Sequence, residues 1–460
     1  MKRSKLFFYI LLGFLSGILL HSFFIHPALL PSGQGAVVSL PALFWPMIIA
    51  LCFGAVVFFW RTPYFLASIL FGVACILGLY RFEMGLNKLN ASFASGEITF
   101  KAAGEVRRYP NSYQFVGENE DGRFWVITKT PIAMTDTVSG DCRFESVKPS
   151  DQYYGWYASK GVNNVCFLNN ATIVERVNTL IKKLFKIKTT AIDHINRLFS
   201  RGSGALLGGM LFGGTSGLSK EAAASFRNAG LTHLVAVSGY NFSLLAFFIL
   251  SLFEFLYVPR RIASIVSILL LIVFFILVGP SASAARAVVM SGLILAAKIF
   301  GRQRNITHIF TVVAASLLLI NPLSLRYDAG FVLSFVATGT LIYAVPWLLE
   351  NLGKWMRLKG MKLKFLWWSA KDMVKAFFEI IAASSLIMIT TAPVLWFFFG
   401  RVSLASIVSN ALVGPIIPLV MIGGYLFTIV SFIYLPLSGI FVWSLNLLLK
   451  YIIAVASFLS

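Results

Sequence analysis

The chain has 460 residues, of which 58% are hydrophobic and 12% are charged, and its formal net charge is +21. Soluble domains carry about twice that share of charged residues, so the composition excludes an ordinary soluble protein. Runs of 18 or more mostly apolar residues recur from end to end, which predicts a polytopic α-helical membrane protein.

The first 96 residues are predicted to form N-terminal transmembrane helices. A basic start, Met1–Lys5, precedes an apolar run from Leu6 to Phe24. No small-residue cleavage site follows, so we expect an uncleaved anchor whose basic end is cytoplasmic. Further predicted spans at 40–60 and 64–80 place the next segment outside the cytoplasm.

Residues 97–175 differ from the rest of the chain. They hold ten of its eighteen acidic residues and several short segments of strand character separated by turn signals. About eighty residues of short strands predict a small extracytoplasmic β-barrel. The predicted strands are Ile98–Val106, Ser112–Val116, Arg123–Lys129 and Asn164–Leu168.

Aromatic side chains in this segment have two interpretations, base stacking and core packing. The segment has eight Lys/Arg and ten Asp/Glu residues, a net charge of about −2. A groove that binds a nucleic-acid strand should be basic, because phosphate neutralisation dominates affinity. We therefore favour core and membrane-interface positions for Tyr109, Tyr113, Phe115, Phe124, Trp125, Tyr153, Tyr154 and Trp156.

Two of the four cysteines, Cys142 and Cys166, fall in this predicted extracytoplasmic domain, while Cys52 and Cys75 lie in apolar spans. An oxidising compartment favours a disulfide between the first two. Closing a loop of about 24 residues is worth roughly 3 kcal/mol. Two unpaired buried thiols are the alternative.

Residues 176–201 have apolar side chains at helical spacing, with basic residues at the remaining positions. Seven basic residues against Asp193 give about +6. This pattern predicts an amphipathic interfacial helix on the outer membrane surface, between the barrel and the helices that follow. Lipid headgroups and an incoming polyanion both remain open as its partners.

Residues 202–460 are predicted to form a transmembrane domain that contains an interrupted helix. Ser219 is a suitable N-cap and Gly230 a suitable stop for a short helix over 220–229. The apolar stretch 231–245 follows, and Gly239 loosens it. In hydrocarbon such a break faces protein or a wet cavity, although a plain helix kink is the alternative. The polar or small residues of interest here are His233, Ser238, Gly239 and Asn241.

A second interruption is predicted at Asn410–Pro415, with Pro418 shortly after. Broken helices in two distant segments of a membrane protein indicate a translocation path. Asn410, Gly414 and Pro415 are the candidate residues of this second break.

The apolar segments contain one cation and one anion that require an explanation, because placing an ionisable group in a membrane costs at least ~2.5–3.5 kcal/mol. Arg286 follows the small residues 281–285, and Asp328 is its candidate partner at the outer end of a later span. A role in the path and a structural ion pair are both open.

Basic turns in the second half determine the predicted topology. These basic turns are at residues 260–261, 302–304 and 354–375. They fall on one side of the membrane if each apolar segment between them crosses once, and the positive-inside rule makes that side cytoplasmic. This topology agrees with the spans counted from the N-terminus only if Gly204–Gly230 is re-entrant and does not cross the membrane. About eleven spans result, with Ser460 outside the cytoplasm. The predicted spans of this half are 235–257, 262–279, 284–300, 306–320, 328–349, 376–399, 403–430 and 437–459.

Several of these segments, in this order, resemble the motifs of the ComEC family, the competence DNA-uptake membrane channels. They are Gly204–Gly213, Gly217–Ser219, His233–Gly239, Ser283–Ala287, Asn321–Phe335, Phe399–Ser403 and Asn410–Pro415. The resemblance covers roughly 200–430. Tyr240-Asn241 stands where the family has Leu-His, and Val332 stands in place of its Gln, so proton exchange by that second histidine is not carried over.

The resemblance implies an oligonucleotide-binding-like (OB-like) fold for the barrel and a channel in the bacterial cytoplasmic membrane that carries single-stranded DNA into the cell. Its expected lining is His233, Ser238, Gly239, Asn241, Arg286, Asp328, Asn410, Gly414 and Pro415. A small-solute or lipid transporter with broken helices is the main rival. A membrane-embedded hydrolase that uses His233 and Ser238 is a weaker one.

Catalytic motifs are not recognised in this sequence. It contains no Gly-x-x-x-x-Gly-Lys-Ser/Thr, no His-x-His or His-Glu-x-x-His cluster and no Gly-x-Ser-x-Gly elbow. We therefore expect no nuclease, ATPase or hydrolase activity, no metal and no cofactor in this chain. Pulling force is expected from a cytoplasmic helicase-like ATPase that docks at 354–375. Strand degradation and DNA capture are expected from a separate nuclease and a separate receptor.

Overall fold

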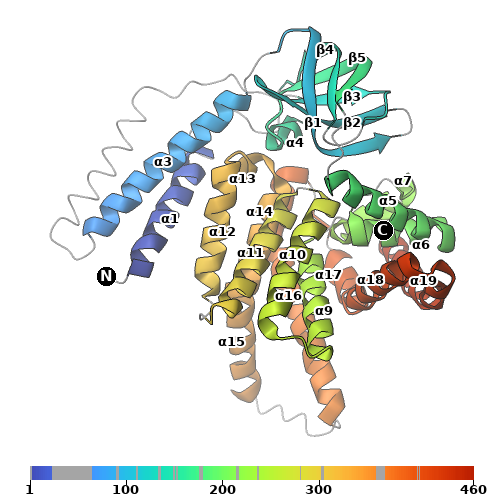
Figure 1. Ribbon diagram of the computed structural model, residues 1–460. Helices are drawn as coiled ribbons and strands as arrows, with labels where there is room; N and C mark the ends of the chain where they lie inside the picture. The colour runs from blue at the N-terminus through green and yellow to red at the C-terminus, as the bar shows by residue number, and fades with distance from the viewer. Residues whose placement is uncertain are drawn as a thin grey trace. The chain divides into compact units, whose positions relative to one another are not determined.

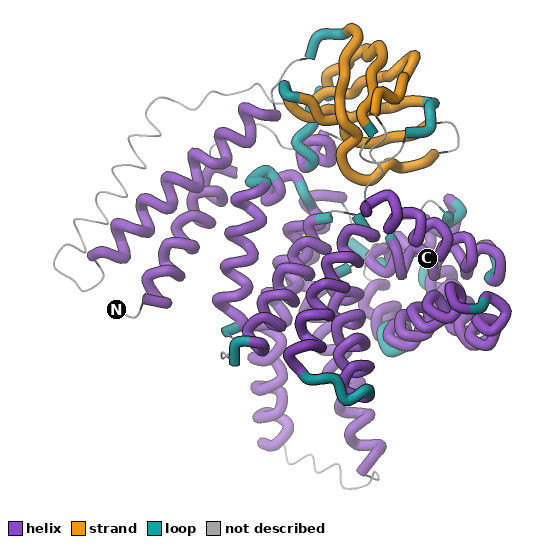
Figure 2. The backbone as a smooth tube through the Cα atoms, viewed as in Figure 1, coloured by secondary structure: helices purple, strands orange, loops and turns teal. Residues whose placement is uncertain are grey.

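The computed structural model combines helices with a β-barrel (Figures 1 and 2). The chain forms two compact units. Unit 1 comprises Met1–Lys182, Gly279–Arg286 and Arg304–Val332, and unit 2 comprises Lys183–Val278, Ala287–Gln303 and Leu333–Ser460. The structure describes residues 3–22, 65–89, 93–109, 112–132, 136–148, 151, 154–175, 180–213, 217–235, 238–279, 281–301, 305–358, 368–400, 402–403 and 405–460.

Unit 1 contains the predicted β-barrel, which is closed and has five strands in the order β1-β2-β3-β5-β4. The β3–β5 pair is parallel and the other pairs are antiparallel. The four segments given as examples of strand character are all strands, with longer ends for most, and β4 is a further strand whose pattern Gly140 and Asp141 interrupt. The strands are β1 (Gly96–Tyr109), β2 (Ser112–Asn119), β3 (Gly122–Thr128), β4 (Thr137–Ser146) and β5 (Asn164–Glu175).

The barrel core is aromatic and is linked by a disulfide. Phe100, Phe115 and Phe124 are buried together with aliphatic side chains of the other strands. Cys142 of β4 and Cys166 of β5 form the predicted bond, with a Cα–Cα distance of 5.3 Å across adjacent strands. The predicted disulfide is therefore confirmed, and both cysteines belong to the core cluster.

Phe115, Phe124, Trp125 and Tyr154 follow the core interpretation, whereas Tyr113 and Trp156 are only half-buried. Phe115, Phe124 and Trp125 are buried, so their rings are not available to stack on bases. Trp125 packs edge-on against Trp156 of the short helix α4 (Tyr154–Ser159), with ring centroids 4.9 Å apart. Burial raises the pKa of the Tyr154 phenol, which therefore stays neutral. The side chains of Tyr109 and Tyr153 lie outside the described residues.

Two helices of unit 1, α1 (Arg3–Leu20) and α3 (Phe65–Leu89), pack side by side through glycines (Figure 1). A side chain at Gly13 or Gly17 would overlap the backbone of α3, so only glycine lets the two helices approach this closely. Since Gly13 faces Phe71 and Gly17 faces Cys75, the two helices run parallel.

Helix α3 is longer than the predicted span 64–80. The additional residues 81–89 include Arg81 and Glu83, which interrupt the apolar run in the sequence. Both groups are satisfied by neighbours: Arg81 donates to the carbonyls of Leu319 and Ile320 at 2.8 Å each, and Glu83 lies 2.7 Å from His21 Nε2. The prediction ended the helix too early because these partners are distant in sequence. The predicted span 40–60 lies outside the described residues.

Unit 1 also contains α12 (Ile306–Ile320) and α13 (Ser324–Tyr327), and residues at and after the end of α12 contact helix α4 of the barrel domain. The amide of Asn321 donates to the carbonyl of Ser159 at 2.9 Å, and the Tyr154 and Tyr327 rings meet edge to face at 6.1 Å. Lys182 forms an ion pair with the buried carboxylate of Asp136 at 2.5 Å. The barrel is thus held to its helices by polar contacts.

Unit 2 is helical and contains most of the predicted transmembrane domain. An amphipathic helix, α5 (Leu180–Leu198, which begins in unit 1), lies within the predicted range 176–201, and its place at the membrane interface stays a prediction. The remaining helices are α6 (Arg201–Phe212), α7 (Lys220–Asn228), α8 (Thr232–Val235), α9 (Gly239–Phe255), α10 (Arg260–Val278), α11 (Ala282–Ile299), α14 (Ala329–Gly339), α15 (Val345–Leu358), α16 (Trp368–Phe399), α17 (Ala405–Val413), α18 (Ile417–Ile433) and α19 (Leu435–Phe458), with a π-helical turn at Thr340–Ala344 between α14 and α15. The first residues of α11 and α14 belong to unit 1.

Helices occupy each predicted span that the structure describes, but fewer than eleven have membrane-spanning length. Among the described residues, six helices are long and apolar enough to cross, or seven if the bent pair α17–α18 counts as one. With 12 and 9 residues, α6 and α7 are only about 18 and 14 Å long, so neither crosses a ~30 Å core alone. The eleven-span topology and its orientation stay predictions.

Candidate translocation path

The first interruption begins where the sequence placed it. Ser219 caps α7, and its Oγ accepts the backbone N–H of Ala222 at 3.1 Å. The helix ends at Asn228, and Gly230 then adopts φ +72°, a conformation that L side chains rarely adopt. The short predicted helix 220–229 with its glycine stop is confirmed.

The predicted break at Ser238–Gly239 is also present, since α8 ends at Val235 and α9 begins at Gly239. Asn241 is buried in the first turn of α9, and its amide donates to the carbonyl of Met210 at 3.0 Å. The Ser238 hydroxyl donates to Asn241 Oδ1 at 3.3 Å. These bonds attach the start of α9 to the last turn of α6, so Asn241 positions the break.

The second interruption separates α17 from α18, which are bent by 51° relative to each other. Gly414 donates its N–H to the Asn410 carbonyl at 2.8 Å, and a Cβ atom at Gly414 would lie 2.6 Å from that same oxygen. Pro415 is exposed, and Pro418 stands in the first turn of α18. Glycine and proline thus end one helix and start the next, as predicted.

The segment that precedes the first break contacts the segment that precedes the second break, within unit 2. The Ser409 hydroxyl on α17 donates to the Ala229 carbonyl at 2.7 Å, and the Ser403 hydroxyl donates to the Asn228 carbonyl. A Cβ atom at Gly230 would overlap the Ser406 side chain and lie 3.1 Å from its Cα. We call this contact between the end of α7 and α17 the α7–α17 junction.

Sequence reasoning missed the serines of this junction. Ser406 and Ser409 lie one turn apart on one side of α17, and Ser403 precedes that helix at the same spacing. That spacing was a usable signal, because the last carbonyls of α7 have no partner inside their own helix. In an apolar environment the hydroxyls supply the partners that water would supply elsewhere.

Exposed polar groups are found beside the junction. Arg227, Asn228, Thr232 and His233 are all exposed, and His233 Nδ1 lies 3.2 Å from the Gly230 carbonyl. Arg227 was not among the predicted site residues, yet it is a cation in the last turn of α7. The junction therefore combines buried hydroxyl contacts with an accessible polar and cationic rim.

Arg286 and Asp328 belong to unit 1, apart from the set described above. Asp328 precedes α14, and its Oδ1 accepts the backbone N–H of Phe331 at 3.1 Å, the geometry of a helix cap. Arg286 is half-buried in the second turn of α11, between the buried small residues Ala284 and Ala287. Their pairing stays a prediction.

The basic loop 354–375 is described only in part. Residues 359–367 lie outside the described residues, and no side chain of the loop is described.

Within the described part of the chain, no group of three or more His, Cys, Asp or Glu side chains is arranged to hold a metal ion.

The fold and the junction define a class: a helical membrane protein with a small β-barrel domain and two interrupted helices in contact. The family model described as "Competence protein" matches residues 210–460, more than half of the chain. The protein therefore belongs to the competence protein family, whose curated members include ComEC-type proteins.

Two curated relatives are similar over part of their length. ComE operon protein 3 of Bacillus subtilis is 30% identical over 161 residues, which is 35% of this chain and 20% of the relative. Recombination protein 2 of Haemophilus influenzae is 23% identical over 282 residues, 60% of this chain and 34% of the relative. The matches thus span about a third or less of these relatives. No solved structure matches the chain.

Proposed function

We propose that this protein carries single-stranded DNA across the bacterial cytoplasmic membrane during natural transformation. The observation that carries the proposal is the α7–α17 junction, where two interrupted helices meet beside exposed polar and cationic side chains. Membership of the competence protein family supports the same conclusion.

The chemistry of the cargo explains why such a junction is needed. Each nucleotide of a DNA strand carries a negative charge, so the strand requires a wet path through the membrane. Interrupted helices are tolerated at membrane depth where they are buried in protein or line a cavity. The hydroxyls of Ser403 and Ser409 donate hydrogen bonds to the last carbonyls of α7. The exposed side chains of Arg227 and His233 therefore remain available to bind phosphates.

Arg286 and Asp328 are proposed to act at the path as well, with Asn410, Gly414 and Pro415 forming the second break and Ser238 and Gly239 the first. Asn241 is proposed as a positioning residue, because its amide is used by Met210. A guanidinium in a site of low dielectric offers a passing phosphate a stronger contact than it would in water.

The barrel is proposed to be an OB-like domain outside the cytoplasm. Five strands in a closed barrel agree with that fold, and the disulfide agrees with an oxidising compartment. Its net charge of about −2 and its buried aromatics argue against tight strand binding. We therefore assign DNA capture to a separate receptor, strand degradation to a separate nuclease, and pulling to a cytoplasmic helicase-like ATPase.

Uptake of labelled DNA tests the proposal most simply. In host cells that lack the protein, fluorescent DNA should bind to the cell surface but should not reach the cytoplasm. Expression of the wild-type chain should restore entry. Normal entry in cells without the protein would contradict the proposal, whereas a small-solute transporter would change solute uptake and leave DNA entry intact.

Arg286 offers a sharper test of the path. Arg286→Ala should abolish DNA entry without lowering the amount of protein in the membrane, and Arg286→Lys should retain part of the activity because a cation remains. If Arg286 serves only as an ion-pair partner, Arg286→Ala should lower protein abundance. In that case Arg286→Ala combined with Asp328→Ala should restore both abundance and entry.

A further inference from the structure

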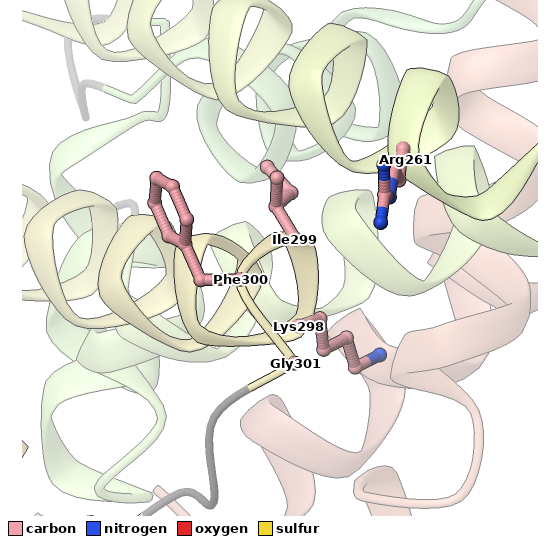
Figure 3. Close-up of a pocket in the computed structure, with 5 residues that line it drawn as sticks. All are labelled: Arg261, Lys298, Ile299, Phe300 and Gly301. Atoms are coloured by element: carbon pink, nitrogen blue, oxygen red, sulfur yellow. The ribbon is translucent and has the colours of Figure 1, made fainter.

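A hollow lies where the start of α10 meets the end of α11 in unit 2. It has a volume of about 490 Å³ and is lined by Arg261 of α10 and by Lys298–Gly301 at the end of α11. Figure 3 shows the nitrogen ends of Arg261 and Lys298 turned to the same side of the hollow, with Phe300 pointing the other way. No feature of the proposed DNA path uses these residues.

The described lining of the hollow is positively charged. Among the described residues it includes two cations and no carboxylate. The acidic residue that precedes α10, Glu254, lies 3.9 Å from Arg260. Within the described part of the chain, no ion pair engages Arg261 or Lys298. Two cations that line one hollow repel each other unless an anion lies between them.

Exposed apolar side chains line the hollow and also precede α10 in the chain. Phe255 ends α9, Leu256 and Tyr257 follow it, and all three are exposed, Tyr257 to 95%. Phe300 beside Lys298 is 75% exposed. Exposed aromatic residues next to Lys and Arg are typical of the headgroup level of a membrane, where an apolar ring and a charged end are both accommodated.

Aliphatic side chains continue from the hollow along one face of α10. Ile262, Ile265, Leu269 and Ile272 are all exposed, and their spacing places them on one stripe of the helix. This stripe suits acyl chains, whereas a nucleic-acid strand would use cations and aromatic rings but would gain nothing from exposed Ile and Leu side chains. The occupant therefore has an anionic head and an apolar body.

We propose that the hollow between α10 and α11 binds the phosphate of an anionic phospholipid headgroup through Arg261 and Lys298, with the acyl chains along the exposed stripe of α10. The proposal is independent of DNA transport. It also predicts that this end of α10 lies at a membrane surface rich in anionic lipid.

Lipid titration of the full-length protein in detergent micelles tests the site. Phosphatidylglycerol and phosphatidylcholine are added in turn, and bound lipid is counted by native mass spectrometry. The wild type should bind phosphatidylglycerol saturably and in preference to phosphatidylcholine. Each of Arg261→Gln and Lys298→Gln should weaken phosphatidylglycerol binding by about fivefold, and the double variant by about 25-fold.

A matched control separates a site from general charge attraction. Lys101→Gln with Lys129→Gln removes the same charge from two exposed positions of the barrel domain that do not line the hollow, and it should leave the preference unchanged. Equal weakening in both double variants would overturn the proposal. Inorganic phosphate that binds as tightly as the lipid would also overturn the proposal. The same holds for an oligonucleotide whose binding depends on Arg261 while phosphatidylglycerol binding does not.

Discussion

The β-barrel and the α7–α17 junction are stabilised in opposite ways. The barrel buries Phe100, Phe115 and Phe124 in an apolar core and is closed by a disulfide. The junction relies on serine hydroxyls that donate to the last carbonyls of α7 and on a glycine at the point of contact. Apolar burial stabilises a domain that faces water, whereas in an apolar medium an interrupted helix depends on finding polar partners within the protein.

Gly230 is the position where the junction should break most completely. Gly230→Ala places a Cβ on a backbone with φ +72° and against Ser406. The unfavourable backbone conformation alone costs about 1–3 kcal/mol, and the overlap adds to it. We expect loss of DNA entry together with reduced thermal stability, measured in cells and on the purified protein.

Gly208→Ala is the matched control for that substitution. Gly208 lies in α6, and a Cβ there would have no atom within 4 Å. Alanine also favours helix over glycine by about 1 kcal/mol. This variant should keep wild-type entry and stability. Equal damage from both substitutions would mean that the contact with Ser406 is not what makes Gly230 necessary.

The disulfide should provide the next largest effect, confined to the barrel. Cys142→Ser with Cys166→Ser removes a link across 24 residues and should lower the barrel's free energy of unfolding by about 3 kcal/mol. Limited proteolysis of the intact protein should then cut within 97–175. Reductant should sensitise the wild type in the same way and leave the double variant unchanged. Cleavage in the helices of unit 2 instead would contradict a local effect.

Ser409 should give a smaller effect at the junction. Ser409→Ala leaves the buried Ala229 carbonyl without its hydroxyl donor, which costs about 1–3 kcal/mol. Ser444→Ala removes an exposed hydroxyl that bonds only within its own helix, and thermal stability should not change. A melting temperature that falls equally in both variants would show that the Ser409 contact adds nothing specific.

The sequence predicted the features that depend on local chemistry. Ser219, Gly230, Gly239 and Gly414 mark helix starts and breaks through their own backbone preferences, and the structure confirms each of these positions. The disulfide followed from composition and compartment, and the structure confirms that pairing as well.

The features that depend on distant partners could not be predicted in this way. Asn241 was expected to line a path, but its amide donates to Met210, 31 residues earlier in the chain. Helix α3 continues past its apolar run because Arg81 finds carbonyls about 240 residues away. Ser409 acts on Ala229 across 180 residues. Each of these contacts needs the tertiary fold before it can be recognised.

Photo-crosslinking at His233 tests the central claim most directly. A photoreactive amino acid is placed at His233, which is exposed beside the junction, or at Trp443, which is 79% exposed on α19. Cells are illuminated during uptake of radiolabelled DNA. The account predicts that the strand is linked to the protein from position 233 and not from position 443. Labelling from 443 alone, or equally from both positions, would contradict a path at the α7–α17 junction.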